Sequence, residues 1–370
     1  MHKMSKRVKN KTSKIAKINV IGGIFGTGGY QVHTRNLANA LNKQTDVKLV
    51  CELPPGWEQN VSDKELEMIK REDADTNLII AMPQNWRQYA DKKVNIGFLV
   101  WEGDKIPKSW IEECLNPMIN YIFVPSQHTK DAIINTFSDW DGANAKTVNK
   151  IKVMPHGVSD MFKPEDIKKD SFTFLCNKGF KNLEDRGGIQ YLLKAYNEEF
   201  TDENVKLILK INPAYGIPDI NKLLKEIGYT QNSPKLLINT ENIPVKDMKE
   251  LYNKCDVFVS PTRAEAFNLP CLEALACGKP VISTNFGGQT DYLNKTNSFL
   301  IGGKLKEVEH DIIYEGIRWL TPNIDELRKV MRYTYENPIK LKTMAPQCLK
   351  TAKTYTWDAT ATKIKDLLKL

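Results

Sequence analysis

The chain is poor in the features that hold small or secreted proteins together. Its seven cysteines among 370 residues are odd in number and scattered, and no two have the C-x-x-C spacing of zinc and redox sites. The five histidines form no cluster with nearby aspartates or cysteines, so we expect no protein-bound metal and no cofactor. A chain of this length holds about two domains, each large enough for its own hydrophobic core. A reducing cytoplasm fits this use of cysteine.

Long apolar runs and, near the start, acidic residues are also missing. No stretch approaches the roughly 18 apolar residues of a membrane-spanning helix, and residues 1–17 lack the apolar centre of a signal peptide. This segment carries seven lysines or arginines and no acid, and without these seven the formal net charge of +8 falls to +1. We therefore predict a basic, disordered tail over residues 1–17, followed by a nearly neutral folded body.

The charge distribution limits the partners that can be expected. The body shows no basic stripe with interleaved aromatic residues, so no nucleic acid is expected as a partner. The tail is suited to weak association with an anionic membrane, or it is a solvated leader without a partner. We expect a cytoplasmic protein that is at most peripheral to a membrane.

The glycine-rich turn after the first apolar run lacks the spacing of a dinucleotide-binding loop. Counted from Gly26, the third glycine of G-x-G-x-x-G would fall at Gln31. A nicotinamide dehydrogenase is therefore disfavoured. Gly28 and Gly29 still allow backbone N–H groups to approach an anion closely.

Apolar runs alternate with helical patterns along most of the chain, which is typical of a doubly wound α/β fold. The stretch 160–171, with Pro164 and mixed charges, separates two series of predicted strands, and from residue 324 onward the pattern is helical. We therefore predict two Rossmann-like halves. The predicted strands are 18–21, 47–51, 78–81, 94–100, 121–124, 152–154, 172–176, 205–210, 236–238, 257–259 and 281–283.

The most informative segment is 260–284, in which Glu265 and Glu273 stand eight positions apart. Apolar runs flank it on both sides, so we predict strand, loop, helix and strand in that order. Pro270 suits the first turn of the helix because its missing N–H would have no partner there. Glu265 then lies in the loop and Glu273 in the helix.

A helix that begins at this point offers a site for an anion. The backbone N–H groups of Phe267, Asn268 and Leu269 would face the crevice at the ends of the strands. Unpaired N–H groups at a helix N-terminus are suited to a phosphate. Two carboxylates flank this position, and carboxylates are suited to sugar hydroxyls.

The segment resembles the paired-glutamate signature of the retaining nucleotide-sugar glycosyltransferases of family 4 (glycosyltransferase group 1), which have the GT-B fold. The first half of the chain is less similar to this family. The matching positions are Ser260-Pro261, Glu265, Glu273, Ala274, Gly278, Pro280-Val281-Ile282, Gly287-Gly288, Asp291, the glycine loop, Pro125-Ser126, Pro155-His-Gly-Val158, Phe162-x-Pro164 and Tyr355-Thr-Trp357.

The resemblance implies an arrangement of domains. Residues 18–163 would form an acceptor domain, and residues 164–355 a donor domain that faces it across a cleft. A last helix, 356–370, would return to the first domain. In the family the donor is a nucleotide sugar and the acceptor carries a hydroxyl.

The resemblance also implies roles for residues on the donor side. Glu265 would be catalytic, close to the transferred sugar, where a carboxylate stabilises positive charge at the anomeric carbon. Glu273 would accept hydrogen bonds from the ribose. The remaining residues of the donor site would contact the diphosphate: Gly28, Gly29, Phe267, Asn268 and Leu269.

The cations expected at the diphosphate depart from the family pattern. Gly187 stands where the family has the lysine of a Lys-Gly pair, and Asn268 stands where it commonly has glycine. Lys178 follows a predicted strand and precedes a glycine, which makes it the first candidate for this charge. Arg186 is the second candidate. Lys181 and Lys210 are alternatives.

The resemblance also implies acceptor residues in the loop after the strand 94–100, because some members of the family carry a similar aromatic-Glu-x-Asp run. Glu102 would be a second catalytic residue that orients the acceptor or the sugar, Trp101 would stack on a glycan ring, and Asp104 would bind the acceptor. His156, in the boundary motif, is a further acceptor candidate. For Trp101 a partly buried aromatic loop, and for His156 a structural role, are the alternatives.

The resemblance, together with these residues, implies a retaining hexosyltransferase. The donor would be a nucleotide-diphosphate sugar, with UDP favoured over GDP, and the acceptor a hydroxyl of a glycan, lipid or protein-linked acceptor. A nucleotide-sugar epimerase or hydrolase of the same fold and a non-catalytic nucleotide-sugar binding protein are the alternatives. The sequence identifies neither the sugar nor the acceptor.

Overall fold

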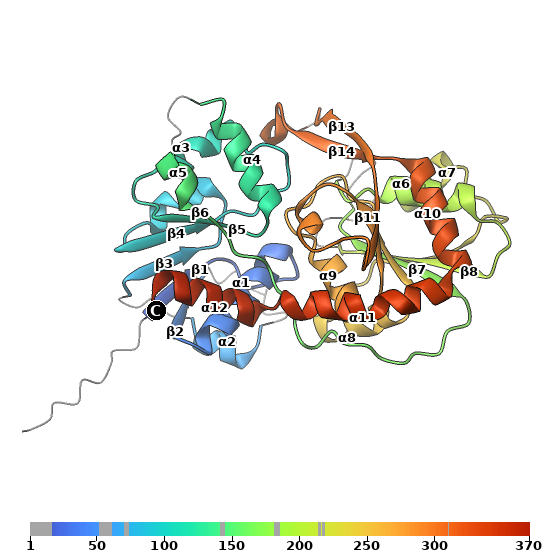
Figure 1. Cartoon of the computed structure of the whole chain (residues 1–370), viewed down its shortest axis with the longest axis horizontal. Coiled ribbons are helices and arrows are strands. Elements are labelled where there is room, and N and C mark those ends of the chain that lie inside the picture. The colour runs from blue at the N-terminus through green and yellow to red at the C-terminus, as the bar shows by residue number, and fades with distance from the viewer. Residues whose placement is uncertain are drawn as a thin grey trace, which may run out of the picture.

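The computed structural model describes residues 17–51, 61–69, 74–140, 145–180, 186–213, 216, 219–309 and 311–370. The predicted tail, apart from Lys17, and the alternative cation Lys181 lie outside the described residues. Two six-stranded parallel sheets form two halves that lie side by side, with helices on both faces of each sheet (Figure 1). This is the doubly wound α/β architecture that the sequence predicts.

The first half is built on a sheet with the strand order β2-β1-β3-β4-β5-β6. One face packs against α1 and α12, through side chains such as Leu37 and Ile364, and the other against α3 and α4, through Ile111 and Ile133. The elements are β1 (Lys17–Ile21), α1 (Gly29–Asn42), β2 (Asp46–Val50), α2 (Asp63–Glu67), β3 (Thr76–Ile79), η1 (Pro83–Asn85), η2 (Arg87–Tyr89), β4 (Val94–Phe98), η3 (Lys108–Trp110), α3 (Ile111–Leu115), β5 (Tyr121–Val124), α4 (Gln127–Phe137), α5 (Ala145–Lys150) and β6 (Ile151–Val153).

The second half has the strand order β12-β11-β10-β7-β8-β9. The central strands β7 and β10 are buried on both faces, which explains their mainly apolar sequence. The elements are β7 (Phe172–Lys178), α6 (Ile189–Glu199), β8 (Val205–Ile211), α7 (Ile220–Glu226), β9 (Lys235–Asn239), α8 (Val245–Asn253), β10 (Val257–Ser260), α9 (Leu269–Ala276), β11 (Val281–Thr284), η5 (Gly288–Asp291), β12 (Ser298–Ile301) and α10 (Ile324–Glu336).

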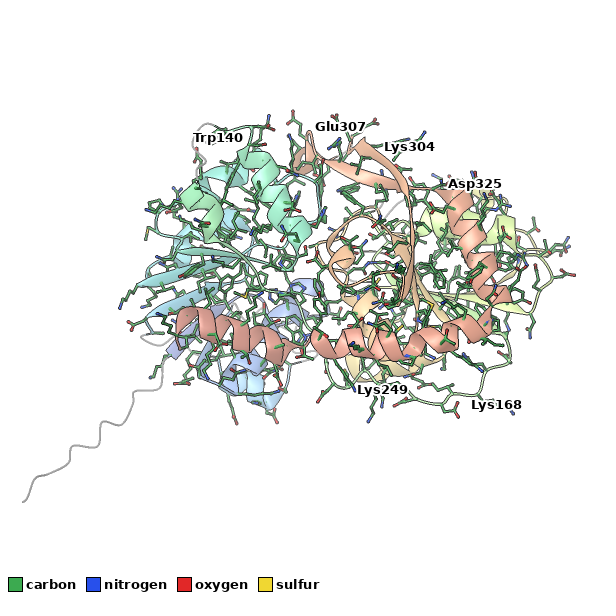
Figure 2. The ribbon with its side chains drawn as sticks, in the orientation of Figure 1. Trp140, Lys168, Lys249, Lys304, Glu307 and Asp325 are labelled. Atoms are coloured by element: carbon green, nitrogen blue, oxygen red, sulfur yellow. The ribbon has the colours of Figure 1, made fainter. Side chains whose placement is uncertain are left out.

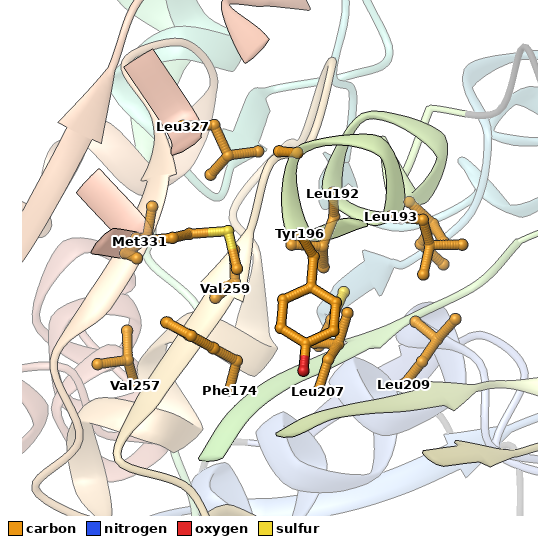
Figure 3. Close-up of a cluster of buried hydrophobic side chains, with 14 of the residues drawn as sticks. Phe174, Leu192, Leu193, Tyr196, Leu207, Leu209, Val257, Val259, Leu327 and Met331 are labelled. Carbon is orange, nitrogen blue, oxygen red and sulfur yellow. The ribbon is translucent and has the colours of Figure 1, made fainter. Parts of the chain in front are cut away.

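A large apolar cluster fixes α6 and α10 on one face of the second sheet (Figure 3). Phe174 of β7 contacts Tyr196 and Phe200 of α6 at ring distances of 6.4 and 5.8 Å. Leu327 and Met331 of α10 complete the cluster, and both are fully buried. Because the sheet is held rigidly between its helices, the ends of β7 and β10 have fixed positions.

The last two helices, α11 (Pro338–Thr354) and α12 (Trp357–Leu368), connect the halves a second time. The chain passes from α11 beside the second sheet to α12, which packs against α1 of the first half (Figure 1). Val158 donates a backbone hydrogen bond to Tyr355 (3.0 Å) at this crossing. The predicted return of the C-terminal helix is confirmed.

Two parts of the second half were not predicted from the sequence, the edge strand β12 and the hairpin that follows it. Between β12 and α10 lies an antiparallel hairpin of β13 (Gly303–Glu307) and β14 (Arg318–Pro322), with the short helix η6 (Ile312–Tyr314) near its tip. Lys304 and Glu307 mark this hairpin at the edge of the molecule where it extends toward the first half (Figure 2). The strands predicted from the sequence are all present, although β3 ends at Ile79 instead of residue 81 and β4 ends at Phe98 instead of residue 100.

Two further expectations concern membrane spans and thiols. No helix within the described ranges is long and apolar enough to cross a bilayer. All seven cysteines are free thiols and six of them are buried, where they pack as small apolar side chains.

The crossing of the chain at residues 155–158 generates the first testable prediction. A Cβ atom on Gly157 would lie 2.0 Å from the backbone nitrogen of Trp357, whereas one on Gly29 would meet nothing within 4 Å. Gly157→Ala must therefore displace α12, and we expect the free energy of unfolding to fall by about 1–3 kcal/mol. Urea unfolding measures the change. Gly29→Ala is the matched control, and equal stabilities of the two variants would contradict the assignment.

Candidate functional site

A cavity of about 1070 Å³ lies between the two halves, and residues of both halves line it. It opens at the carboxyl ends of β7, β8 and β10. The strand order of the second sheet reverses between β7 and β10, and such a reversal leaves a crevice in which open α/β sheets bind ligands. From the first half, the glycine-rich turn and the start of α1 contribute Thr27, Gly29 and Tyr30.

A buried polar cluster forms the centre of the cavity wall. The Lys178 ammonium, at the end of β7, donates hydrogen bonds of 2.7 Å to Glu265 Oε1 and 2.7 Å to Asn268 Oδ1. Asn268 in turn donates to Ser260 Oγ at the end of β10 (3.0 Å). Three separate segments of the second half are joined in this way, and their side chains are those that the sequence singled out.

Asn268 explains why the chain tolerates a departure from glycine at this position. Its backbone is left-handed, with a φ of 69°, a conformation that favours glycine and that asparagine adopts more readily than most residues. It is the N-cap residue of α9, and the helix has proline in its first turn as predicted. Phe267, Asn268 and Leu269 all line the cavity.

The charges of this cluster stabilise one another. Burial alone would raise the pKa of Glu265, but the Lys178 and Arg186 charges outweigh it and hold that pKa below its usual range. Burial likewise disfavours the Lys178 ammonium, yet the Glu265 carboxylate raises the pKa of Lys178 above its usual range. Both groups are therefore charged at neutral pH, and a carboxylate lies beside the cavity with a cation next to it.

Glu273 lies on α9, more than one helical turn after the N-cap Asn268, and also lines the cavity. The buried hydroxyl of Tyr252 donates a hydrogen bond to its Oε2 (2.5 Å) and accepts one from Asn177 Nδ2 (3.1 Å). Burial raises the pKa of Glu273 to about 7, against the opposing effects of the Tyr252 hydrogen bond and the Lys178 charge. The two glutamates thus have different protonation behaviour, although they are eight residues apart on one loop and helix.

Glu102 and Arg186, predicted for opposite sides of the cleft, contact each other. The Arg186 guanidinium forms an ion pair with Glu102 Oε1 across the cavity. Tyr314 of the hairpin donates a second hydrogen bond, of 2.5 Å, to the same oxygen. Arg186, which the sequence suggested as a cation for the diphosphate, is therefore ion-paired with Glu102 of the first half.

Two acceptor predictions need correction. Trp101 is 3% exposed, and its ring stacks on Tyr314 and meets Trp110 edge-on, so it has no free face for a glycan ring. Asp104 accepts hydrogen bonds from the backbone N–H and Nε of Arg318, both of 2.7 Å. Neither residue lines the cavity, and both instead bind the hairpin to the loop after β4.

His156 lines the cavity but packs as an aromatic ring. It contacts His33, Phe267 and Trp357 at ring distances of 4.3, 5.2 and 5.5 Å. Burial lowers the pKa of His156 to about 3, so it is neutral at physiological pH and cannot supply a positive charge. The packing therefore supports a structural role for His156, which was the alternative to acceptor binding.

The two glycines that the sequence suggested for donor binding differ in their positions relative to the cavity. Gly29 lines the cavity, whereas Gly28 is the N-cap of α1 and its carbonyl accepts a hydrogen bond from Val32 (3.0 Å). Gly188 is the N-cap of α6, and its backbone is left-handed with a φ of 74°. A Cβ atom on this residue would lie 2.0 Å from Pro261 O. This glycine therefore lets the Arg186 segment approach the loop after β10.

Sequence reasoning missed Tyr252, Tyr314 and Arg318. Nothing near Tyr252 marks it as a partner of Glu273. The segments 303–307 and 318–322 show no clear alternation of polar and apolar residues, so no sequence signal identified the hairpin. Within the described ranges, no group of three or more histidines, cysteines, aspartates or glutamates is placed to hold a metal ion.

Comparison with known proteins identifies the second half. The family profile described as "Glycosyl transferases group 1" matches residues 160–337. The match covers 178 of the 370 residues, slightly less than half of the chain. The group 1 resemblance inferred from the sequence is thereby confirmed.

Curated relatives match only in part. A probable sucrose-phosphate synthase of Thermosipho melanesiensis is 29% identical over 156 residues, which is 40% of this chain and 35% of that protein. The chain spans about a third or less of the length of the first curated relatives that it matches. These matches support the family and say little about the rest of the chain.

Solved structures match over almost the whole length. Sucrose-phosphate synthase from Thermosynechococcus elongatus superimposes with a TM-score of 0.68 at 16% identity, covering 96% of this chain and 98% of that one. The Anabaena protein HepE, solved with UDP and glucose, gives a TM-score of 0.64 at 15% identity and covers 96% and 99%. These likenesses show the GT-B fold that the sequence predicts.

The protonation of Glu273 generates a prediction about stability. Between its usual pKa near 4.5 and the raised value of about 7, the folded protein retains a proton that the unfolded chain releases. Stability should therefore fall as pH rises through this window, by about 3 kcal/mol from this residue. Urea unfolding of wild type and Glu273→Gln at both ends of the window measures it. The same pH slope in both proteins would contradict the assignment.

Proposed function

We propose that the protein is a retaining glycosyltransferase that moves a hexose-type sugar from a nucleotide-diphosphate donor to a hydroxyl acceptor. The observation that carries the proposal is the Lys178–Glu265–Asn268 cluster at the reversal of the second sheet, beside the N-terminus of α9. This cluster combines a carboxylate, a cation and backbone N–H groups in one wall of a cavity. A nucleotide sugar needs all three, because it carries a diphosphate and develops positive charge on the sugar.

The donor would lie along α9. Its diphosphate would contact the backbone of Phe267, Asn268 and Leu269, where the helix dipole favours negative charge. Glu273 would accept hydrogen bonds from the ribose, and Glu265 would face the transferred sugar. Gly29 of the first half would close the site over the diphosphate.

The charge balance of the cavity favours a further cation for the diphosphate. Lys178 and Arg186 are each engaged by a glutamate. Lys210, at the end of β8, is 4% exposed and donates a hydrogen bond to its neighbour Ile211 O (2.8 Å), but it forms no ion pair with any described residue. Burial lowers the pKa of Lys210 against the opposing effect of the Glu241 charge, and a phosphate oxygen would favour the charged ammonium further. Lys210, a weaker candidate from sequence, therefore becomes a strong one.

The reaction would need no protein nucleophile. The bond from the anomeric carbon to the diphosphate oxygen breaks as the acceptor oxygen attacks from the same face, and the acceptor proton passes to the departing phosphate. Glu265 stabilises the positive charge that develops on the sugar. The lysine and arginine charges take the place of a divalent ion at the leaving group, so we propose that transfer is independent of metal.

Similar proteins support UDP as the nucleotide. HepE has been solved with UDP, with UDP and glucose, and with UDP-glucose. The likeness to HepE is one of fold, at 15 to 16% identity, so the choice of base rests on this analogy. The names of the relatives differ in acceptor, from sucrose-phosphate synthase to capsular polysaccharide biosynthesis, and we propose only a hydroxyl acceptor.

A thermal-shift panel tests the function. Wild-type protein is melted with UDP, GDP, ADP, CMP and dTDP and with sugars of these nucleotides, with and without EDTA. We expect a UDP-sugar to stabilise the protein by about 2.7 kcal/mol at a hundred-fold excess over Kd, because it binds only the folded state. The response should persist in EDTA. No response to any nucleotide would contradict the proposal, and release of free sugar without transfer would favour a hydrolase.

The role of Glu265 has its own test. Glu265→Gln retains an oxygen that can accept the Lys178 hydrogen bond but removes the negative charge beside the sugar. We expect turnover to fall by about 100-fold or more, with donor affinity changed by only a few-fold. Glu336→Gln, on the exposed face of α10, is the matched control. Near-normal turnover by a folded Glu265→Gln protein would rule out this role.

A further inference from the structure

The loop after β4 is held between two elements of different halves. On one side the loop contacts α4 of its own half. His128 Nε2 lies 2.8 Å from Glu102 O, and Thr129 Oγ1 donates a hydrogen bond to Trp101 O (2.7 Å). On the other side, the hairpin of the second half covers the loop. The approach is close, since a Cβ on Gly103 would lie 2.4 Å from a methyl carbon of Ile317.

The hairpin contacts this loop through specific polar groups as well as by packing. Arg318 donates two hydrogen bonds of 2.7 Å to Asp104, and Tyr314 stacks on Trp101 at 4.9 Å with an angle of 20° between the rings. The Tyr314 hydroxyl is then directed at Glu102, which is 6% exposed and lines the cavity. The ring stacking therefore fixes the position from which Tyr314 donates its hydrogen bond.

The two donors leave one side of the Glu102 carboxylate available. Arg186 and Tyr314 both donate to Oε1. Oε2 receives no hydrogen bond from the described residues, and it belongs to a side chain in the cavity wall. A carboxylate with one oxygen held and the other available can orient a hydroxyl group of a substrate.

We propose that Tyr314 is a positioning residue for the acceptor. It holds Glu102 of the first half so that Oε2 accepts a hydrogen bond from the attacking hydroxyl of a polyhydroxylated acceptor. Glu102 belongs to one half and Tyr314 and Arg186 to the other, so this part of the site is complete only when the halves are closed against each other. The inference rests on the proposed transferase function and deepens its acceptor side.

The test is Tyr314→Phe, which keeps the ring that stacks on Trp101 and removes only the hydroxyl. With a donor and acceptor that wild type uses, we expect kcat/KM for the acceptor to fall about 10- to 30-fold, because a hydrogen bond to a charged group is lost. The Kd of the donor should stay within about two-fold, since the hydroxyl that is removed donates to Glu102 and not to a residue of the proposed donor wall. Tyr333→Phe, an exposed tyrosine of α10, is the matched control.

A double-mutant cycle separates positioning from a general structural effect. If Tyr314 acts through Glu102, then Tyr314→Phe should cost less than about three-fold when Glu102→Gln is already present. Equal losses in both backgrounds, or an unchanged kcat/KM in Tyr314→Phe, would overturn the inference. Its failure is distinct from that of the proposed function, because a wild type that transfers sugar to no acceptor would overturn the function itself.

Discussion

The ion pair between Lys178 and Glu265 is the interaction on which the site depends. It joins the end of β7 to the loop after β10, at the place where the strand order of the second sheet reverses. The Lys178 side chain is 4% exposed and the Glu265 side chain 21% exposed, so removal of either partner would leave a poorly solvated charge. Such losses typically cost about 3–5 kcal/mol. The same pair directs the Asn268 side chain, and with it the beginning of α9.

The closed arrangement of the halves depends on a second set of contacts, made by the hairpin. The C-terminal crossing joins the halves through α12, and the hairpin joins them again through Tyr314, Arg318 and their carboxylate partners Glu102 and Asp104. These buried or half-buried charge pairs bring rigidity and specific geometry more than net stability. Because the proposed donor wall belongs to one half and the proposed acceptor carboxylate to the other, catalysis would require closure.

Local patterns in the sequence predicted the doubly wound fold, the strands of the two parallel sheets except β12, and the polar residues beside α9, because each depends on a short segment with a clear period or motif. The partners of Glu102 could not be predicted, since Tyr314 lies 212 residues further along the chain and its role arises only from the packing of the halves. The environment of Trp101 could not be predicted for the same reason. A tryptophan in a loop suggested glycan stacking, but the hairpin covers its face.

The central claim is that the wall formed by β7, β10 and α9 holds the donor, and a crystal structure at saturating nucleotide sugar tests it most directly. We predict the diphosphate within hydrogen-bond distance of the backbone at Phe267–Leu269, the ribose at Glu273 and the sugar beside Glu265, with Lys178 still paired. A nucleotide bound elsewhere, or density for it that avoids α9 and both glutamates, would contradict this claim.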